Sequence, residues 1–333
     1  MTDDSSLLSH VAPIAAEEAV TFAAFLSDAP AFALAHGVVL LPASGARVLA
    51  HSDGAVLCAS SDGRRLVTGG DDGRLVETLP GGETRALADE DGRWIDAVAL
   101  RPDGAFAWSA GRKAHAQDQA GVKKSVDLPS SSRGLAFFPK GYRLALAHYN
   151  GASLWFPNLA AKPEFLEWKG SHLDCTVSPD GNYVMTSMQE NTLHGWRLSD
   201  KQNMRMAGYP GKTRSLSWSP DGKWLATSGA DACILWPFSG KNGPMGAAPR
   251  ECGVREGIKA TRVAFHPTAP IVAVGYEDSM VLLCRVSDGA ELLVRKPGEG
   301  AHAKISALAW DARGARLAFG AENGEAGVLA LPR

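Results

Sequence analysis

The chain of 333 residues has little cysteine, and its five cysteines form no recognisable site. Their number is odd, and no two of them have the Cys-x-x-Cys spacing of a zinc or redox motif. Four of the five stand within short apolar segments, where cysteine behaves as a small hydrophobic residue. This usage favours reduced thiols in a cytoplasmic protein over a disulfide framework or a zinc site.

The chain also lacks an excess of charge and any long uninterrupted apolar run. Its formal net charge is −2, so no overall field draws it to nucleic acid or to an anionic membrane. The most apolar region, residues 20–50, is interrupted by residues such as Asp28 and Pro42, which excludes a membrane-spanning helix. Asp3 and Asp4 stand where a secretory signal carries positive charge. We therefore expect a cytoplasmic protein with neither a nucleic-acid nor a membrane partner.

Catalytic motifs are missing as well. The chain has no Gly-x-Ser-x-Gly and no His-Glu-x-x-His sequence, and its nine histidines are not spaced for local metal ligation. The segment 208–213 resembles a phosphate-binding loop, but too few residues separate Gly208 from Gly211 for the backbone to wrap a phosphate. These absences predict a non-enzymatic protein with no catalytic residues, no metal and no cofactor.

What the chain does have is a recurring turn. Ser-Pro-Asp-Gly occurs at 178–181 and at 219–222, and looser copies stand at 60–63, 101–104, 138–141, 265–268 and 311–314. Proline presets the first turn angle and glycine tolerates a positive φ, so each copy predicts a tight hairpin. From Ser27 to Ala312 the turns recur on average every 41 residues or so, which indicates a repeat architecture.

Each repeat has the same internal plan of short strands. One apolar strand precedes the turn, as in Ile305–Trp310, and a second follows it, as in Tyr183–Ser187. A short polar turn then leads to a third strand, such as Leu193–Leu198, and a more polar fourth segment, such as Glu291–Arg295, links to the next repeat. Several strands are continuous apolar runs, which is expected where a sheet is covered on both faces. The plan predicts an all-β fold.

At these residues the chain resembles the WD-repeat β-propeller family, over roughly residues 10–333. The two Ser-Pro-Asp-Gly turns carry the resemblance, together with Trp155, Trp196 and Trp236, each of which closes a third strand. No third strand ends in the Trp-Asp pair that names the family, so the chain resembles a divergent member. The Ala- and Gly-rich composition favours a bacterial one.

The resemblance implies a buried tetrad of His, Ser or Thr, Asp and Trp in each complete repeat. The candidates are His172, Ser187 and Trp196 in one repeat, Ser228, Asp231 and Trp236 in another, and His302 in a third. No repeat offers all four residue types at the expected places, so apolar packing is expected to supply more of the rigidity.

The resemblance also implies a single closed propeller, and the repeat count favours eight four-stranded blades beginning with Val20–Phe25. Seven blades, with the first unit acting as a cap, is the alternative. The last repeat has no room for a fourth strand after Leu331, so residues around Val11–Ala15 are expected to supply it. That pairing of the N- and C-terminal strands would close the ring. Residues 1–9 are expected to be a flexible N-terminus, and residues 10–333 the propeller.

The function that the resemblance implies is a monomeric scaffold for protein–protein interaction, with another protein or an acidic peptide segment as partner. In a propeller, the residues just before each first strand surround the mouth of the central channel. Cations predominate there in this chain, which predicts a partner-binding site formed by Trp94, Arg133, Arg214, Lys259, Arg262 and Lys304. The alternative is that acidic neighbours cancel these charges. The alternative function is a propeller enzyme, or a binder of small anions or metals at the channel mouth.

Overall fold

Strands make up nearly all the regular structure of residues 6–298 and 303–332, the residues that the computed structural model describes. One short 3-10 helix covers Leu8–His10. The all-β prediction is confirmed. The chain divides into two compact units: unit 1 holds residues 1–35, 40–46 and 209–333, and unit 2 holds residues 36–39 and 47–208.

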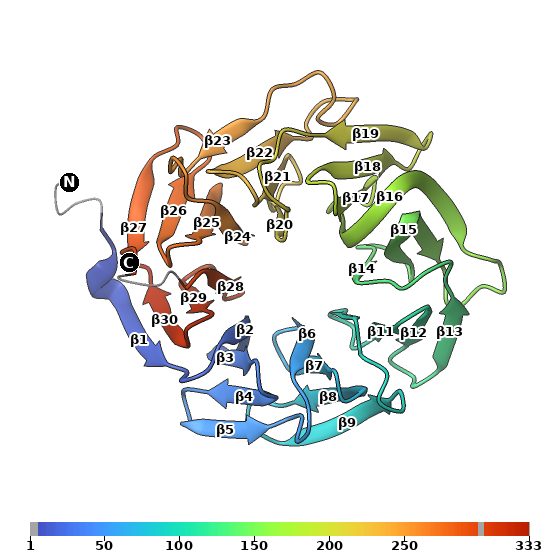
Figure 1. The fold of residues 1–333 in the computed structure, drawn as a ribbon, viewed down its shortest axis with the longest axis horizontal. Helices are drawn as coiled ribbons and strands as arrows, with labels where there is room; N and C mark the ends of the chain where they lie inside the picture. The colour runs from blue at the N-terminus through green and yellow to red at the C-terminus, as the bar shows by residue number, and fades with distance from the viewer. Residues whose placement is uncertain (1–5, 299–302, 333) are drawn as a thin grey trace. The chain divides into compact units, whose positions relative to one another are not determined.

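Hydrogen bonding groups the strands of the described residues into seven sheets, of which six are four-stranded (Figure 1). Unit 2 holds two of the six: β6 (Val56–Ser61), β7 (Leu66–Gly70), β8 (Arg74–Thr78) and β9 (Thr84–Asp89), then β10 (Ala97–Leu100), β11 (Phe106–Ala110), β12 (Lys113–Gln117) and β13 (Lys123–Asp127). A third consists of β2 (Val20–Leu26), β3 (Ala29–Leu34), β4 (Val38–Leu41) and β5 (Ala46–Leu49).

Unit 1 holds the other three four-stranded sheets. Two of them follow the chain order: β20 (Leu216–Trp218), β21 (Trp224–Thr227), β22 (Cys233–Pro237) and β23 (Arg250–Cys252), then β24 (Ala260–Phe265), β25 (Ile271–Tyr276), β26 (Val281–Arg285) and β27 (Glu291–Arg295). The third joins the two ends of the chain: β28 (Ile305–Trp310), β29 (Arg316–Ala321), β30 (Glu325–Ala330) and β1 (Val11–Ala15).

The prediction of eight four-stranded blades is wrong, because residues 134–206 form one six-stranded sheet where two blades were expected. Its strands are β14 (Gly134–Phe137), β15 (Leu144–Trp155), β16 (Glu164–Val177), β17 (Tyr183–Met188), β18 (Leu193–Arg197) and β19 (Gln202–Met206). β15 covers two expected strands and pairs with both β14 and β16. β16 pairs with β15 through its first half and with β17 through its second, so it joins the two expected blades.

The count of seven sheets agrees with the seven-blade alternative, but the first repeat is not a cap. That repeat forms its own sheet, beginning with β2 at the predicted place. The predicted pairing of the chain ends is confirmed: β1 runs antiparallel to β30, with Val11 opposite Leu329 and Ala15 opposite Glu325. Figure 1 shows blue β1 beside red β30.

The predicted N-terminal tail, residues 1–9, is described by the structure only in part. Residues 1–5 lie outside the described residues, but Leu7 is buried and its backbone N–H donates to the Leu293 carbonyl of β27 at 2.7 Å. Ser6 forms a parallel bridge to the same residue. The segment before β1 therefore lies against β27.

The Ser-Pro-Asp-Gly turns are built from side-chain capping as well as from backbone geometry. The Ser178 hydroxyl accepts the backbone N–H of Tyr183 at 2.9 Å and donates to Asp180 at 2.5 Å. Gly181, at φ 78°, donates to the Ser178 carbonyl. The turn at 219–222 repeats these bonds through Ser219. Each turn thus fixes where its second strand begins.

Adjacent sheets meet where a β-branched side chain packs against a glycine of the neighbouring sheet. In unit 1, a Cβ added to Gly275 of β25 would lie 2.5 Å from Ile305 Cγ2. In unit 2, a Cβ added to Gly69 of β7 would lie 2.5 Å from Ile95 Cγ2. Both isoleucines are fully buried. Glycine is required at these two places because any side chain would separate the sheets.

Replacing Gly275 with alanine is therefore expected to destabilise the protein by about 1–3 kcal/mol, the usual cost of overpacking. The clash is with the Cβ and Cγ atoms of Ile305, a fully buried side chain. Urea denaturation followed by tryptophan fluorescence measures the change. Gly240→Ala is the matched control, since its nearest neighbour would be 3.7 Å away. Equal stability of the two variants would contradict this account of the contact.

Candidate functional site

Unit 2 contains a buried network that connects three separate segments of the chain. The imidazole of His51 lies with Nε2 2.9 Å from the Thr68 hydroxyl of β7 and with Nδ1 3.1 Å from both carboxylate oxygens of Asp72. The Thr68 hydroxyl also contacts the Val76 carbonyl of β8. This network was not predicted, because β8 has Val76 and no tryptophan to mark it. The network ties the segment before β6 to β7 and its following turn.

The predicted tetrad around His172 has a different hydroxyl. His172 Nδ1 lies 2.7 Å from Thr186 Oγ1, and His172 Nε2 lies 3.0 Å from the Trp168 carbonyl. Ser187, the predicted partner, has a buried hydroxyl with no hydrogen bond to any residue that the structure describes. The Trp196 indole stacks obliquely 5.5 Å from His172 and makes no hydrogen bond through Nε1. His172 and Trp196 are therefore neighbours, but no tetrad joins them.

The second predicted tetrad is replaced by a tyrosine network in unit 1. The Trp236 indole N–H donates to the Tyr209 hydroxyl at 2.6 Å, and that hydroxyl lies 2.7 Å from Thr227 Oγ1. Ser228 instead accepts the backbone N–H of Arg214, and Asp231 accepts that of Gly257. Tyr209 thus takes the place expected of a histidine. His302, the remaining predicted tetrad residue, lies outside the described residues.

One physical rule explains both misplaced hydroxyls. Successive side chains of a strand point to opposite faces of the sheet. Thr186 shares a face with Trp196, because Thr186 lies opposite His194 in the register, two residues from the tryptophan. Thr227 shares a face with Trp236 in the same way. Each predicted serine follows its threonine by one residue and so faces away.

Most of the predicted basic residues of unit 1 either pair with an acidic side chain or hold strands together. Lys304 lies 2.9 Å from Glu322, and Lys259 lies 4.0 Å from Glu277. Arg262 is half-buried and donates through Nε to the Ser306 carbonyl at 2.6 Å, so it joins β24 to β28. These contacts favour the alternative that acidic neighbours offset the charges of this group. Arg214 is exposed.

The two predicted residues of unit 2 are both exposed on backbone that is held in place. Trp94 is 60% exposed, yet the next residue, Ile95, is fully buried and donates to the Gly70 carbonyl at 3.1 Å. Arg133 is exposed between buried Ser132 and Gly134. Ser132 bonds to the Gly111 carbonyl, and Gly111 donates to Asp96 at 2.7 Å. These bonds bring the segments before β10 and β14 together.

A third exposed side chain, which sequence analysis missed, joins this surface. Tyr149 of β15 is 55% exposed, and its backbone N–H donates to the Ser130 hydroxyl at 2.8 Å. Ser130 stands three residues before Arg133. We call the group Trp94, Arg133 and Tyr149 the unit 2 rim. Burial raises the pKa of the nearby Asp96 carboxyl, and the Gly111 N–H and Arg133 oppose that rise.

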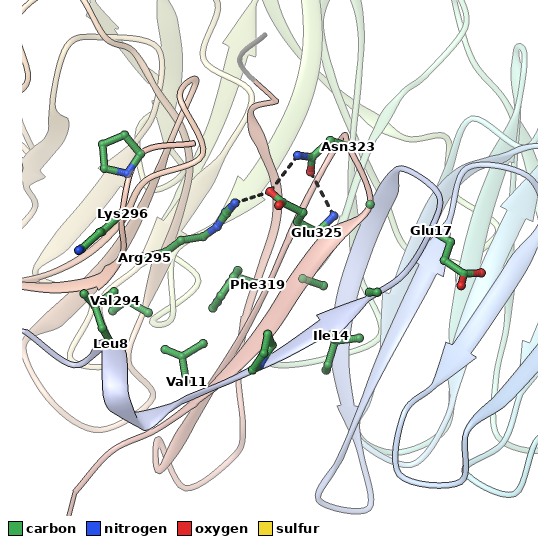
Figure 2. Close-up of a pocket in the computed structure, with 15 residues that line it drawn as sticks. Leu8, Val11, Ile14, Glu17, Val294, Arg295, Lys296, Phe319, Asn323 and Glu325 are labelled. Carbon is green, nitrogen blue, oxygen red and sulfur yellow. Dashed lines mark hydrogen bonds and ion pairs between the residues drawn. The ribbon is translucent and has the colours of Figure 1, made fainter. Parts of the chain in front are cut away.

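Unit 1 contains an open pocket of about 720 Å³ beside the paired chain ends. Its apolar walls come from the 3-10 helix, β1, β27 and β29 (Figure 2), and they include Leu8, Val11, Ile14, Val294 and Phe319. Figure 2 also shows the polar groups at its edge already joined to one another, with Glu325 between Arg295 and Asn323. The Asn323 amide, 2.9 Å away, and Arg295 lower the pKa of Glu325. The pocket therefore offers apolar surface, while Arg295, Asn323 and Glu325 at its edge are already bonded to one another.

Family comparisons agree with the repeated sheets. A family model described as the WD domain, G-beta repeat matches residues 45–76 and 202–236, and one described as the anaphase-promoting complex subunit 4 WD40 domain matches residues 256–331. The chain belongs to the WD-repeat β-propeller family. WD-repeat propellers are in general protein-interaction scaffolds, and the family is typically non-enzymatic.

A solved structure similar to this WD-repeat propeller is the computationally designed Ika8 protein. The TM-score is 0.74 at 17% sequence identity, and the match covers 95% of this chain and 98% of that one. At this identity the likeness shows a shared fold. No curated protein matches the chain.

The described part of this propeller contains neither a metal-ligand cluster nor a membrane-spanning helix. In residues 6–298 and 303–332, no group of three or more His, Cys, Asp or Glu side chains could hold a metal ion. The metal-binding alternative therefore has no ligand cluster to support it there. No helix in the same residues is long and apolar enough to cross a membrane.

Proposed function

We propose that this WD-repeat propeller is a non-enzymatic, monomeric scaffold of the cytoplasm that binds an acidic segment of another protein. The unit 2 rim is the contact surface. The observation that carries the proposal is Trp94, a large aromatic side chain left 60% exposed on a backbone anchored by buried Ile95.

Tryptophan, tyrosine and arginine are the residues that most often dominate the energy of protein interfaces. The unit 2 rim presents one of each: Trp94, Tyr149 and Arg133. The bonds around Ser130, Ser132 and Gly111 order the backbone before any partner arrives. Less conformational entropy is then lost on binding, which favours affinity.

The charge of the rim selects an acidic partner. Arg133 is exposed, and the neighbouring Arg93 is exposed as well. A carboxylate on the partner can accept two hydrogen bonds from a guanidinium while an apolar residue covers the indole. Among the predicted residues of unit 1, Arg214 is exposed and is proposed as a separate contact for an acidic group. Lys259 and Lys304 already have glutamate neighbours, and Arg262 holds two strands together.

The test is a selection of random displayed peptides on the full chain, followed by binding titrations of the selected peptides. We expect acidic peptides with an apolar residue, and a loss of affinity of at least tenfold in Trp94→Ala/Arg133→Glu. Leu159→Ala is the matched control. Leu159 is also an exposed apolar residue, at 57%, but it lies beyond the C-terminal end of β15 and outside the unit 2 rim. Peptides that bind the double variant as tightly as the original chain would overturn the proposed surface.

A further inference from the structure

Three of the five cysteines lie together in unit 1, although the sequence separates them widely. Cys233 begins β22, Cys252 ends β23, and Cys284 lies on β26 of the next sheet. All three are buried in one apolar cluster that also contains Tyr276. Cys58 and Cys175, by contrast, belong to clusters of unit 2 that hold no second cysteine.

The strand register places two of these thiols face to face. Cys233 and Cys252 are directly opposite in the antiparallel pair of β22 and β23. Opposite residues in such a pair have Cα atoms about 4.5–5.5 Å apart, within the range of about 4.4–6.8 Å that a disulfide requires. Cys252 Sγ also lies 3.9 Å from the Cys233 carbonyl. The backbone of the two strands is therefore spaced for a disulfide between these residues.

The third thiol, Cys284, packs in the same buried cluster as Cys252. The chain comes close to β26 at this point because Gly253 follows: a Cβ there would lie 2.2 Å from the Tyr276 hydroxyl and 3.2 Å from Cys284 Sγ. Gly253 has a φ of 65°, so glycine is needed for its conformation as well as for the space.

The central thiol differs electrostatically from its two neighbours. The hydrogen bonds from Cys233 and Cys284 lower the pKa of Cys252. Burial raises the pKa of Cys233, and the bond to Cys252 raises that of Cys284. The thiolate is the reactive form of cysteine. Of the three, Cys252 is therefore the one to react first.

Access to Cys252 comes from the edge of the sheet. β23 has three residues and is the outermost strand, and both Arg250 and Glu251 are exposed. Val254, two residues after the cysteine, is 61% exposed. Short edge segments flanked by exposed loops open at low free-energy cost compared with the core. A small oxidant can reach the sulfur during such openings.

We propose that Cys252 and Cys233 are a peroxide-sensitive dithiol that closes reversibly to a disulfide. The Cys252 thiolate attacks one oxygen of hydrogen peroxide, the O–O bond breaks, and a sulfenic acid and hydroxide form. The Cys233 thiol then attacks the sulfenic sulfur, the S–S bond forms, and the S–O bond breaks. The Cys233 proton leaves with the hydroxyl group as water. Two thiols are oxidised and one peroxide is reduced to two waters.

The disulfide would join β22 to β23 two residue pairs away from the loop 239–249, which connects the two strands. Most of that loop is exposed. Closing it covalently limits the conformations that the loop can adopt when β23 opens. The site thus couples the redox state of the surroundings to one surface loop of unit 1. It does not depend on the function proposed for the unit 2 rim.

Hydrogen peroxide titration of the reduced full chain tests the proposal. We expect two of the five thiols to be lost, peptide mapping to show a Cys233–Cys252 bond, and dithiothreitol to restore both thiols. Cys252→Ser and Cys233→Ser should each abolish the bond, whereas Cys175→Ser should leave it unchanged. The disulfide is mapped in the unaltered chain. The test therefore stands even if a serine variant fails to fold.

Three results would overturn the proposal. One is retention of all five thiols at peroxide concentrations that oxidise free cysteine. Another is oxidation of Cys252 that stops at sulfinic acid without a disulfide. The third is a mapped disulfide that joins Cys252 to Cys284, which would show that the register of β22 and β23 does not choose the partner.

Discussion

Replacing Trp108 with alanine is expected to lower the free energy of unfolding by about 3–5 kcal/mol. Trp108 of β11 is fully buried, and its indole N–H donates to the Glu90 carboxylate at 2.9 Å. Its ring stacks on His115 at 4.9 Å and on Phe106 at 5.6 Å. Alanine would leave a cavity and would remove the hydrogen bond to a mostly buried carboxylate.

Two further variants separate the causes of that loss, each measured by urea denaturation. Trp108→Phe keeps a ring but removes the N–H, so it is expected to cost about 1–3 kcal/mol. Trp94→Ala removes the same residue type from an exposed position and is expected to change stability by about 0.5 kcal/mol or less. If Trp108→Ala were no more destabilising than Trp94→Ala, the network around Glu90 would have no stabilising role.

Acidification is expected to destabilise the protein steeply between pH 6.5 and pH 4. Burial lowers the pKa of His148, His172 and His194, and for His194 it lowers the value from 6.5 to about 4. Between those two values the unfolded chain binds a proton that the folded protein does not. Stability is therefore fully present above pH 6.5 and falls as the pH falls towards 4.

For His194 alone the loss reaches about 3 kcal/mol at pH 4, at 1.36 kcal/mol for each pKa unit. Equilibrium unfolding in urea at a series of pH values measures it. His194→Gln is expected to flatten the profile, while replacement of exposed His10 by glutamine should leave it unchanged. A stability that is constant from pH 7 to pH 4.5 would show that these imidazoles are not kept neutral by the fold.

The sequence was sufficient to predict the strands because its turns repeat at nearly constant spacing. It was not sufficient to place the buried hydroxyls, since a Thr-Ser pair such as Thr186-Ser187 is ambiguous by one residue. A signal was available: Thr68, Thr186 and Thr227 each stand six residues after the aspartate of the preceding turn. The networks of His51 and Tyr209 were missed because they depend on contacts between segments with no shared motif.

The sheet count failed for a different reason. The pattern of each repeat predicts the strands inside it. The pattern does not show whether the last strand of a repeat ends there or continues into the next repeat. β16 continues through the link between two repeats, from Glu164 to Val177, and so joins sheets that the repeats would separate. The sequence was sufficient to identify the cations of the predicted binding site but not their ion-pair partners. Glu277 and Glu322 stand 18 residues after Lys259 and Lys304, and only the fold brings each glutamate close to its lysine.

The pairing of β1 with β30 has a consequence for biosynthesis. β1 leaves the ribosome well before β30, the strand with which it pairs. Until β30 follows, the apolar side chains of Val11 and Ile14 remain without their native neighbours. A chain that stops before β30 therefore leaves β1 unpaired and exposed to chaperones and proteases.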